Sequence, residues 1–313
     1  MGAVLHNIGV FFGHLAAVGW GSLGLALLCQ FTKVCCVSRA WHNIIDASYP
    51  EEHVPQRTVT GAMFARVGIN AIVPARGGDV AALFLVKRRV AGSSIPTLGT
   101  TLIVLTLFDM VAASCFILWA LATGELPGRS VLSRLPGFDF RWLFEHFRGT
   151  LIAVGIVVLV ILILLLWFAE QLFEFRRRIA RGFAILANKS RYLRTVVVWQ
   201  VADWTLRLAT IFFFLRAFHV PATLHNAILV QVTQSLAVLF PISPSGIGTE
   251  QALLLYIFSG TASKTTLLSF SVGMRVTLIL FNALFGFTAL FLMLRTLRWR
   301  RHVDADPEVA AER

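Results

Sequence analysis

The chain has 313 residues, of which 57% are hydrophobic and 14% charged, and its mean hydropathy is +0.75. Soluble domains carry about 25% charged residues, so this composition excludes an ordinary soluble protein. The formal net charge is +12, but the basic residues stand in short segments between apolar runs, which excludes a nucleic-acid-binding face and favours contact with anionic lipid.

A helix needs about 20 apolar residues to cross a bilayer, and several runs in this chain approach that length. They predict an all-α, polytopic membrane protein, with a single membrane domain over residues 1–302 and a polar, disordered tail over residues 303–313. The predicted spanning helices cover residues 10–32, 95–122, 150–169, 195–217 and 266–294.

The segments between these helices differ in basic content, and this difference predicts the topology. Lys33, Arg57 and residues 87–89 fall on the side rich in lysine and arginine, as do residues 176–194 and 295–301. Because the basic side of a membrane protein faces the cytoplasm, we expect the N-terminus outside and the C-terminus in the cytoplasm. The expected location is the bacterial inner membrane.

Two further apolar segments, residues 58–88 and 222–260, are each interrupted by proline, glycine and an ionisable residue. Each is either a re-entrant hairpin or a pair of spanning helices, because both return the chain to the side it came from. Helices rise about 1.5 Å per residue, so the halves are short for crossing and we favour re-entrant hairpins. A broken backbone at membrane depth survives only against protein or a water-filled cavity, so the breaks predict a binding site.

The order of these elements predicts an inverted repeat. Repeat one covers about residues 10–122 and repeat two about residues 195–294, with the helix at 150–169 as the linker that inverts the second copy. Inverted repeats with broken helices near the midplane are a recurring plan of transporters.

The first break lies within residues 70–79. Pro74 ends the incoming helix, and Gly77 and Gly78 let the backbone turn before the next helix begins. The free amides of that helix start, with Arg76 beside them, predict an anion site that suits a lipid phosphate. The carboxylate that follows, at position 79, is either part of this site or a first-turn partner of the helix dipole.

The second break repeats this plan before Glu250, and its helix-breaking residues are Pro241, Pro244, Gly246 and Gly248. Glu250 opens the outgoing helix. It is either a first-turn partner of the helix dipole or a carboxylate that faces a cavity and titrates with proton flux, and the sequence does not decide between these.

Ionisable residues inside the predicted membrane segments number four acidic and four basic: Arg66, Arg76, Asp79, Asp109, Asp203, Arg207, Glu250 and Arg275. A lone charge in hydrocarbon costs at least about 2.5–3.5 kcal/mol, so this balance predicts ion pairs. Asp203 and Arg207, four residues apart, form either a structural salt bridge or part of a site. No nucleophile–base set, metal-ligand spacing or nucleotide motif stands out, so we expect no catalytic residue, metal or cofactor.

The motif Asn70-x-x-x-Pro74-Ala-Arg76-x-Gly78-Asp79 resembles the Asn-x-x-x-Pro-Ala-Arg-x-Gly-Glu motif of the lysylphosphatidylglycerol synthase membrane-domain family, also called flippase-like or UPF0104 proteins. Residues 241–250 are similar to the family's Pro-x-x-Pro-Gly-Gly-x-Gly-x-x-Glu region, with the glutamate one place early. Two more family positions match, an aspartate at Asp109 and an arginine at Arg275. The resemblance covers nearly the whole chain.

This resemblance implies a protein that moves lipids or lipid-linked headgroups between leaflets. The substrate-binding residues it implies are Asn70, Arg76, Asp79, Asp109, Glu250 and Arg275. We expect no aminoacyl-transfer domain. The family's Glu-Arg is Leu105-Thr106 here, Ala81 stands for an arginine, and Ser245 stands for a glycine. The lost cavity charges favour an isoprenoid or hopanoid-type cargo.

The leading hypothesis is a lipid translocase whose partners are anionic or isoprenoid membrane lipids, with no nucleic acid. One alternative is an accessory subunit that anchors lipid-biosynthesis enzymes. Another is a membrane enzyme that modifies a lipid headgroup with Asp79 or Glu250 as general base. The sequence names neither the lipid nor the oligomeric state.

Overall fold

The computed structural model describes most of the chain. The described residues are 19–73, 76–90, 92–125, 180–239, 249–258 and 262–304, with the backbone alone at 238, 239, 249 and 296–304. Within these ranges the regular structure is helical throughout, which confirms the predicted all-α class.

The helices are named here in chain order. They are α2 (Trp20–Ser48), α3 (Gln56–Ile72), α4 (Gly77–Lys87), α5 (Ile95–Ala122), α10 (Ala184–Ala187), α11 (Lys189–Tyr192), the π-helical η1 (Leu193–Val197), α12 (Val198–Ala217), α13 (Leu224–Leu239), α14 (Thr249–Ile257) and α15 (Lys264–Asp304).

Among the described residues, four helical segments are long and apolar enough to cross a membrane: Trp20–Ser48, Ile95–Ala122, Lys189–Ala217 and Lys264–Arg295. Helix α5 has the bounds predicted from sequence. Its run is apolar except for one charged residue, Asp109, and its start is fixed by Ser94, which caps the first turn by accepting a hydrogen bond from the Thr97 amide. The predicted helix at 150–169 lies outside the described residues.

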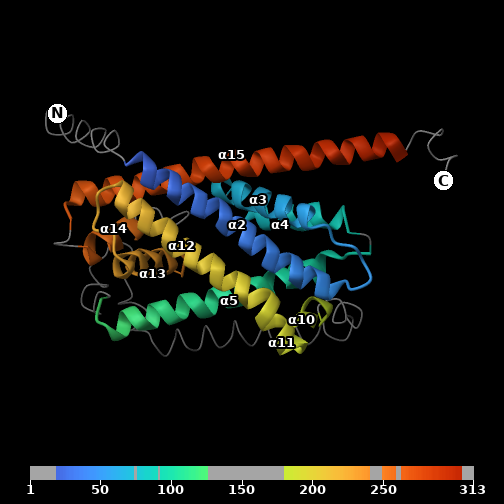
Figure 1. The fold of residues 1–313 in the computed structure, drawn as a ribbon, viewed down its shortest axis with the longest axis horizontal. Helices are drawn as coiled ribbons and strands as arrows, with labels where there is room; N and C mark the ends of the chain where they lie inside the picture. Colours follow the sequence, from blue (N-terminus) through green and yellow to red (C-terminus); the bar gives the residue numbers. More distant parts are fainter. Residues whose placement is uncertain are drawn as a thin grey trace, which may run out of the picture.

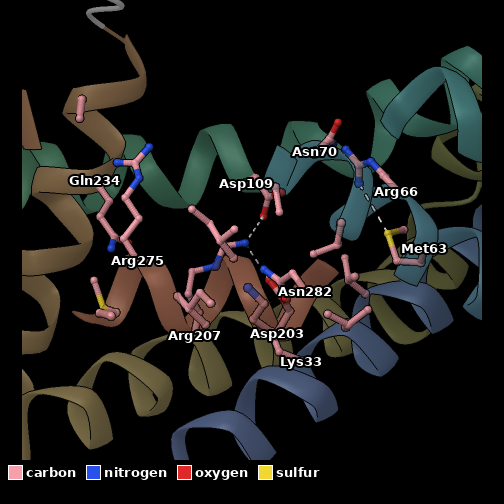
Figure 2. A pocket seen from close by; sticks show the side chains of 18 of the residues that line it. Lys33, Met63, Arg66, Asn70, Asp109, Asp203, Arg207, Gln234, Arg275 and Asn282 are labelled. Carbon is pink, nitrogen blue, oxygen red and sulfur yellow. Dashed lines mark hydrogen bonds and ion pairs between the residues drawn. The ribbon is translucent and has the colours of Figure 1, made fainter. Parts of the chain in front are cut away.

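The end of the first helix corrects a sequence prediction. The apolar run predicts that this helix stops at residue 32, whereas α2 continues to Ser48. The prediction treats Lys33, the first charge after the run, as the start of a cytoplasmic loop. In the structure Lys33 lies beside Asp203 in the interior of the bundle, so its charge does not end the helix (Figure 2).

The last helix is also longer than predicted, since α15 runs past residue 294 to Asp304 and includes the first two residues of the predicted tail. Residues 305–313 lie outside the described part of the chain.

The helices form a bundle in which α2 and α12 lie side by side through the middle, α15 lies against α3 along one edge, and α5 lies along the opposite edge (Figure 1). The halves of the first broken segment, α3 and α4, occupy one end of the bundle. The halves of the second, α13 and α14, occupy the other end (Figure 1).

Two hydrophobic cores correspond to these two ends. One contains Trp41 and Ile44 of α2 packed with residues of α3, α4 and α5. The other contains Ala26 of α2 packed with residues of α12, α13, α14 and α15, including Phe214 and Phe270. Helix α2 therefore contributes to both cores and joins the two ends.

The halves of each broken segment differ in length. At about 1.5 Å per residue, the 11 residues of α4 and the nine of α14 give helices of roughly 17 and 14 Å. Both are shorter than a hydrocarbon layer of about 30 Å. Re-entrant insertion and the inverted relation of the two repeats stay predictions.

Helices α3 and α15 cross at two glycines that allow their backbones to touch. A Cβ atom on Gly68 would lie 2.6 Å from the Asn282 carbonyl oxygen and 2.6 Å from the Gly286 Cα. A Cβ on Gly286 would lie 2.5 Å from the Gly68 Cα. Small residues at membrane helix crossings give such close backbone approach, and this crossing places α15 against the first broken segment.

We predict that Gly68→Ala lowers the stability of the purified protein by about 1–3 kcal/mol, because the obstructing atoms are backbone and cannot move away cheaply. The measurement is thermal unfolding in detergent. Gly24→Ala is the matched control, since a Cβ at Gly24 meets nothing within 4 Å. Equal unfolding temperatures for the two variants would contradict the close crossing.

Candidate functional site

A cavity of about 500 Å³ lies between the two cores and receives residues from α2, α3, α5, α12, α13, α14 and α15. This volume is within the range of small-molecule pockets, about 300–1,000 Å³. Its polar lining residues are Lys33, Arg66, Asn70, Asp109, Asp203, Arg207, Gln234, Glu250, Arg275 and Asn282. Figure 2 shows Arg66 and Asn70 at one end, Gln234 and Arg275 at the other, and Lys33, Asp109, Asp203 and Arg207 between them.

At the first break, the Asn70 side chain links α3 to the start of α4 by two hydrogen bonds. Its Oδ1 accepts a hydrogen bond from the Gly78 amide at 2.8 Å, and its Nδ2 donates to Asp79 Oδ1 at 2.9 Å. Arg66 Nε donates to the same carboxylate oxygen at 2.7 Å. The carboxylate in the first turn of α4 is therefore held by an amide and a guanidinium from α3.

The residues between these partners explain the rest of the motif. A Cβ on Gly78 would lie 2.2 Å from the Arg66 carbonyl oxygen, so glycine is required for α4 to approach α3. Arg76 caps α4 in the left-handed conformation, with φ 58° and ψ 33°. That conformation costs a non-glycine residue roughly 1–2 kcal/mol. Pro74 lies outside the described residues.

Arg76 is placed at the edge of the site. Its side chain is 71% exposed, and its Nε lies 3.2 Å from Asp79 Oδ2. It does not line the cavity. A guanidinium with this exposure can meet an incoming anion while it keeps contact with Asp79.

At the second break, Glu250 in the first turn of α14 is held by two other helices. Arg275 of α15 donates from Nη1 to Glu250 Oε2 at 3.0 Å, and Gln234 of α13 donates to Oε1 at 3.3 Å. The Glu250 side chain is only 9% exposed. The helix breakers Pro241, Pro244, Gly246 and Gly248 lie outside the described residues.

The two breaks thus share one arrangement. In each, a carboxylate in the first turn of the outgoing helix is bound by a guanidinium and a side-chain amide from other helices, and Asp79 has a second guanidinium, that of Arg76, at 3.2 Å. They differ in the source of the guanidinium, because Arg66 belongs to the same broken segment as Asp79, whereas Arg275 comes from α15.

Between the breaks, Arg207 of α12 joins two carboxylates. Its Nη2 lies 3.2 Å from Asp203 Oδ2 and 3.8 Å from Asp109 Oδ1, and its guanidinium lies 4.5 Å from the centroid of the Trp204 ring. The Trp204 indole donates to Asp109 Oδ1 at 2.8 Å. Asp203 is almost fully buried, and removing the partner of a buried charge costs about 3–5 kcal/mol. The predicted Asp203–Arg207 pair is confirmed, and it lies within the site.

Among the described residues, the charges around the cavity balance. Four basic side chains line it, namely Lys33, Arg66, Arg207 and Arg275, together with the acidic Asp109, Asp203 and Glu250. Asp79, which binds Arg66, supplies a fourth negative charge. Unpaired charges are costly in an apolar bundle, so a balanced set can remain buried without a ligand and can exchange partners when a charged ligand enters.

The structure brings most of the predicted site residues together. Asn70, Asp109, Glu250 and Arg275 line one cavity, and Asp79 is attached through Arg66. The binding roles given to these residues and to Arg76 stay predictions.

The substrate-binding set predicted from sequence omits three charged residues that lie at the centre of the cavity, namely Lys33, Asp203 and Arg207. Helical spacing is the sequence signal that could have placed Lys33 in the site. It stands three residues after Gln30 and four residues before Val37, so the three share one face of the helix, and Val37 also lines the cavity.

Metal binding has no support in the described part of the chain, where no group of three His, Cys, Asp or Glu side chains is placed to hold an ion. The site consists of charged and amide side chains in a partly apolar wall. Such a set can bind a polar or charged group by hydrogen bonds and ion pairs.

Comparison with known proteins identifies the family. The profile of the family described as "Lysylphosphatidylglycerol synthase TM region" matches residues 6–286, and the chain belongs to this family. A UPF0104 membrane protein of Methanocaldococcus jannaschii is 23% identical over 198 residues, which cover 60% of this chain and 78% of that protein. No solved structure matches the chain.

We predict that Asn70→Ala increases hydrogen exchange in the first turn of α4 about fivefold, because the loss of one backbone hydrogen bond costs about 1 kcal/mol. Exchange is measured by mass spectrometry on peptides that cover residues 77–82. Asn226→Ala is the control, since Asn226 donates to the Pro221 carbonyl at 2.8 Å and does not line the cavity. Unchanged exchange in Asn70→Ala would show that the Asn70 hydrogen bond does not stabilise the first turn of α4.

Proposed function

We propose that this protein moves a lipid with a polar headgroup, of phospholipid or isoprenoid type, from one leaflet of the bilayer to the other. The observation that carries the proposal is the set of seven charged side chains lining one cavity of an apolar helical bundle. Charged residues within membrane segments are rare and mark substrate pathways. The family's description also joins the chain to proteins that handle a lipid, lysylphosphatidylglycerol.

The cavity size suits a headgroup. A volume of about 500 Å³ can hold a polar headgroup, while long hydrocarbon tails remain in the surrounding lipid. Helices α5 and α15 present exposed apolar residues for contact with those tails, among them Met110, Leu118, Leu280 and Phe291. Arg76 would meet the headgroup at the edge of the site, and Arg275 would bind it inside.

The two breaks would serve as the two entrances. If the segments at 58–88 and 222–260 enter the membrane from opposite faces, the Arg66–Asp79 and Arg275–Glu250 pairs close opposite ends of one cavity. A negatively charged headgroup can replace the carboxylate as the partner of the arginine. Each ion pair would then open in turn as the headgroup binds. Asp79, Asp109 and Glu250 then balance the charge at each step.

Transport would be facilitated or coupled to an ion, with the N-terminus outside and the C-terminus in the cytoplasm of a bacterial inner membrane. The protein would leave the lipid chemically unchanged, as a translocase and not an enzyme.

We predict that Arg275→Gln slows translocation of fluorescent lipid in proteoliposomes at least tenfold, because it removes the guanidinium that binds inside the cavity and leaves Glu250 buried without its ion pair. Arg76→Gln should slow it less, since Arg76 is 71% exposed. The assay uses a panel of phospholipids and isoprenoid lipids, with leaflet position read by a membrane-impermeant quencher.

The matched control is Arg191→Gln, which breaks an exposed ion pair with Asp46 at 3.1 Å outside the cavity. It should translocate at the wild-type rate. Equal rates for Arg275→Gln and wild type across the panel would refute this site, and recovery of chemically altered lipid would replace the translocase with an enzyme.

A further inference from the structure

Lys33 is the basic residue of the cavity whose role is still unassigned. It lies near the middle of α2, between the parts of that helix that enter the two cores, and it lines the cavity. Its ammonium makes no hydrogen bond and no ion pair within 4 Å with any described residue. Figure 2 shows Lys33 beside Asp203, Arg207 and Asn282.

The other cations that line the cavity already have carboxylate partners. Arg66 binds Asp79 at 2.7 Å, and Arg275 binds Glu250 at 3.0 Å. Arg207 is shared by Asp203 and Asp109. Among the described residues that line the cavity, Lys33 is therefore the cation whose donors are available without breaking an ion pair.

Two neighbours of Lys33 also have unused donors. The Nε–H group of Arg207 is buried and has no acceptor among the described residues. Asn282 accepts a hydrogen bond at its Oδ1 from Gln30 at 3.0 Å, and its own amide hydrogens have no acceptor within the described ranges. A buried donor without an acceptor costs about 1–3 kcal/mol, so the Arg207 Nε–H favours a ligand that supplies an acceptor, and the partly buried Asn282 amide can donate to the same ligand.

We infer that Lys33, Arg207 and Asn282 bind the phosphate group of the lipid headgroup. The three side chains come from α2, α12 and α15 and line one cavity, so a group bound there can meet donors from three helices. A phosphate offers two or three unbridged oxygens, which can accept from several donors at once, and bonds from charged donors are roughly twice as strong as neutral ones.

This inference rests on the proposed translocase function, because it takes the bound group to be part of the transported lipid. It narrows the cargo to lipids that carry phosphate, either as a diester in a phospholipid or as a monoester on an isoprenoid. It also separates the binding point at the centre of the cavity from the two ion pairs that close its ends.

The test measures binding to the purified full chain in detergent, so it does not depend on transport. The probes are farnesyl phosphate, dihexanoyl phosphatidylglycerol and the neutral farnesol, and the readout is the ligand-induced rise in unfolding temperature as ligand is titrated. We expect the wild type to bind at least one phosphate probe at least tenfold more tightly than farnesol. Lys33→Gln should weaken phosphate binding about tenfold or more, and Lys33→Arg should restore most of it.

Two further variants control for effects of Lys33→Gln that do not act through direct binding, namely the loss of a lysine as such and the change in cavity charge. Lys189→Gln removes an exposed lysine outside the cavity and should bind like the wild type. Lys33→Gln combined with Asp109→Asn removes the ammonium but keeps the cavity charges balanced, and it should also lose phosphate binding. Restored binding in this double variant would show that Lys33 acts through charge balance alone and would overturn the inference.

The remaining outcomes separate this inference from the proposed function. If Lys33→Gln binds the phosphate probes as tightly as the wild type, or if farnesol binds as tightly as they do, the inference is wrong whatever the transport assay shows. If phosphate binding depends on Lys33 but no lipid crosses proteoliposomes, the phosphate site stands and the translocase proposal fails. The preferred phosphate probe identifies the cargo as a monoester or a diester.

Discussion

The constraint on which this structure depends is that every charge inside the bundle needs a compensating charge from another position. Arg207 of α12 is held by Asp109 of α5, and Arg275 of α15 is held by Glu250 of α14. The first pair joins helices far apart in the sequence, and the second joins two consecutive helices whose contacting side chains are mostly buried. The same pairs that stabilise the bundle therefore also define the wall of the cavity.

Local sequence patterns predicted the parts of the fold that depend on local chemistry. The bounds of α5 and the break before α4 follow from an apolar run and from Pro74, Gly77 and Gly78. The course of α2 past Lys33 could not be predicted in this way, because the cavity that Lys33 lines is completed by residues of other helices, among them α5 and α12. The contact between Gly68 and Gly286 joins residues more than 200 positions apart, and nothing in either local sequence identifies its partner.

The two breaks look alike in sequence but differ in construction. The first is complete within α3 and α4, where Asn70 and Arg66 hold both the helix start and its carboxylate. The second is held from outside by Arg275. The sequence showed both carboxylates and both arginines, but which arginine serves which carboxylate is a tertiary property, set by the packing of α15. Movement of α15 would therefore act on Glu250 directly, through Arg275, and on the Asp79 contacts only through its packing against α3.

Helix α2 belongs to both hydrophobic cores, and this has a mechanical consequence. A continuous 29-residue rod cannot stretch, so a displacement of one end of the bundle is transmitted along its axis to the other. Trp41 and Ile44 pack on one side of Lys33 and Ala26 packs on the other, so Lys33 lies on the stretch of α2 that connects the two cores. A group bound at Lys33 would therefore contact a helix that both ends of the bundle share.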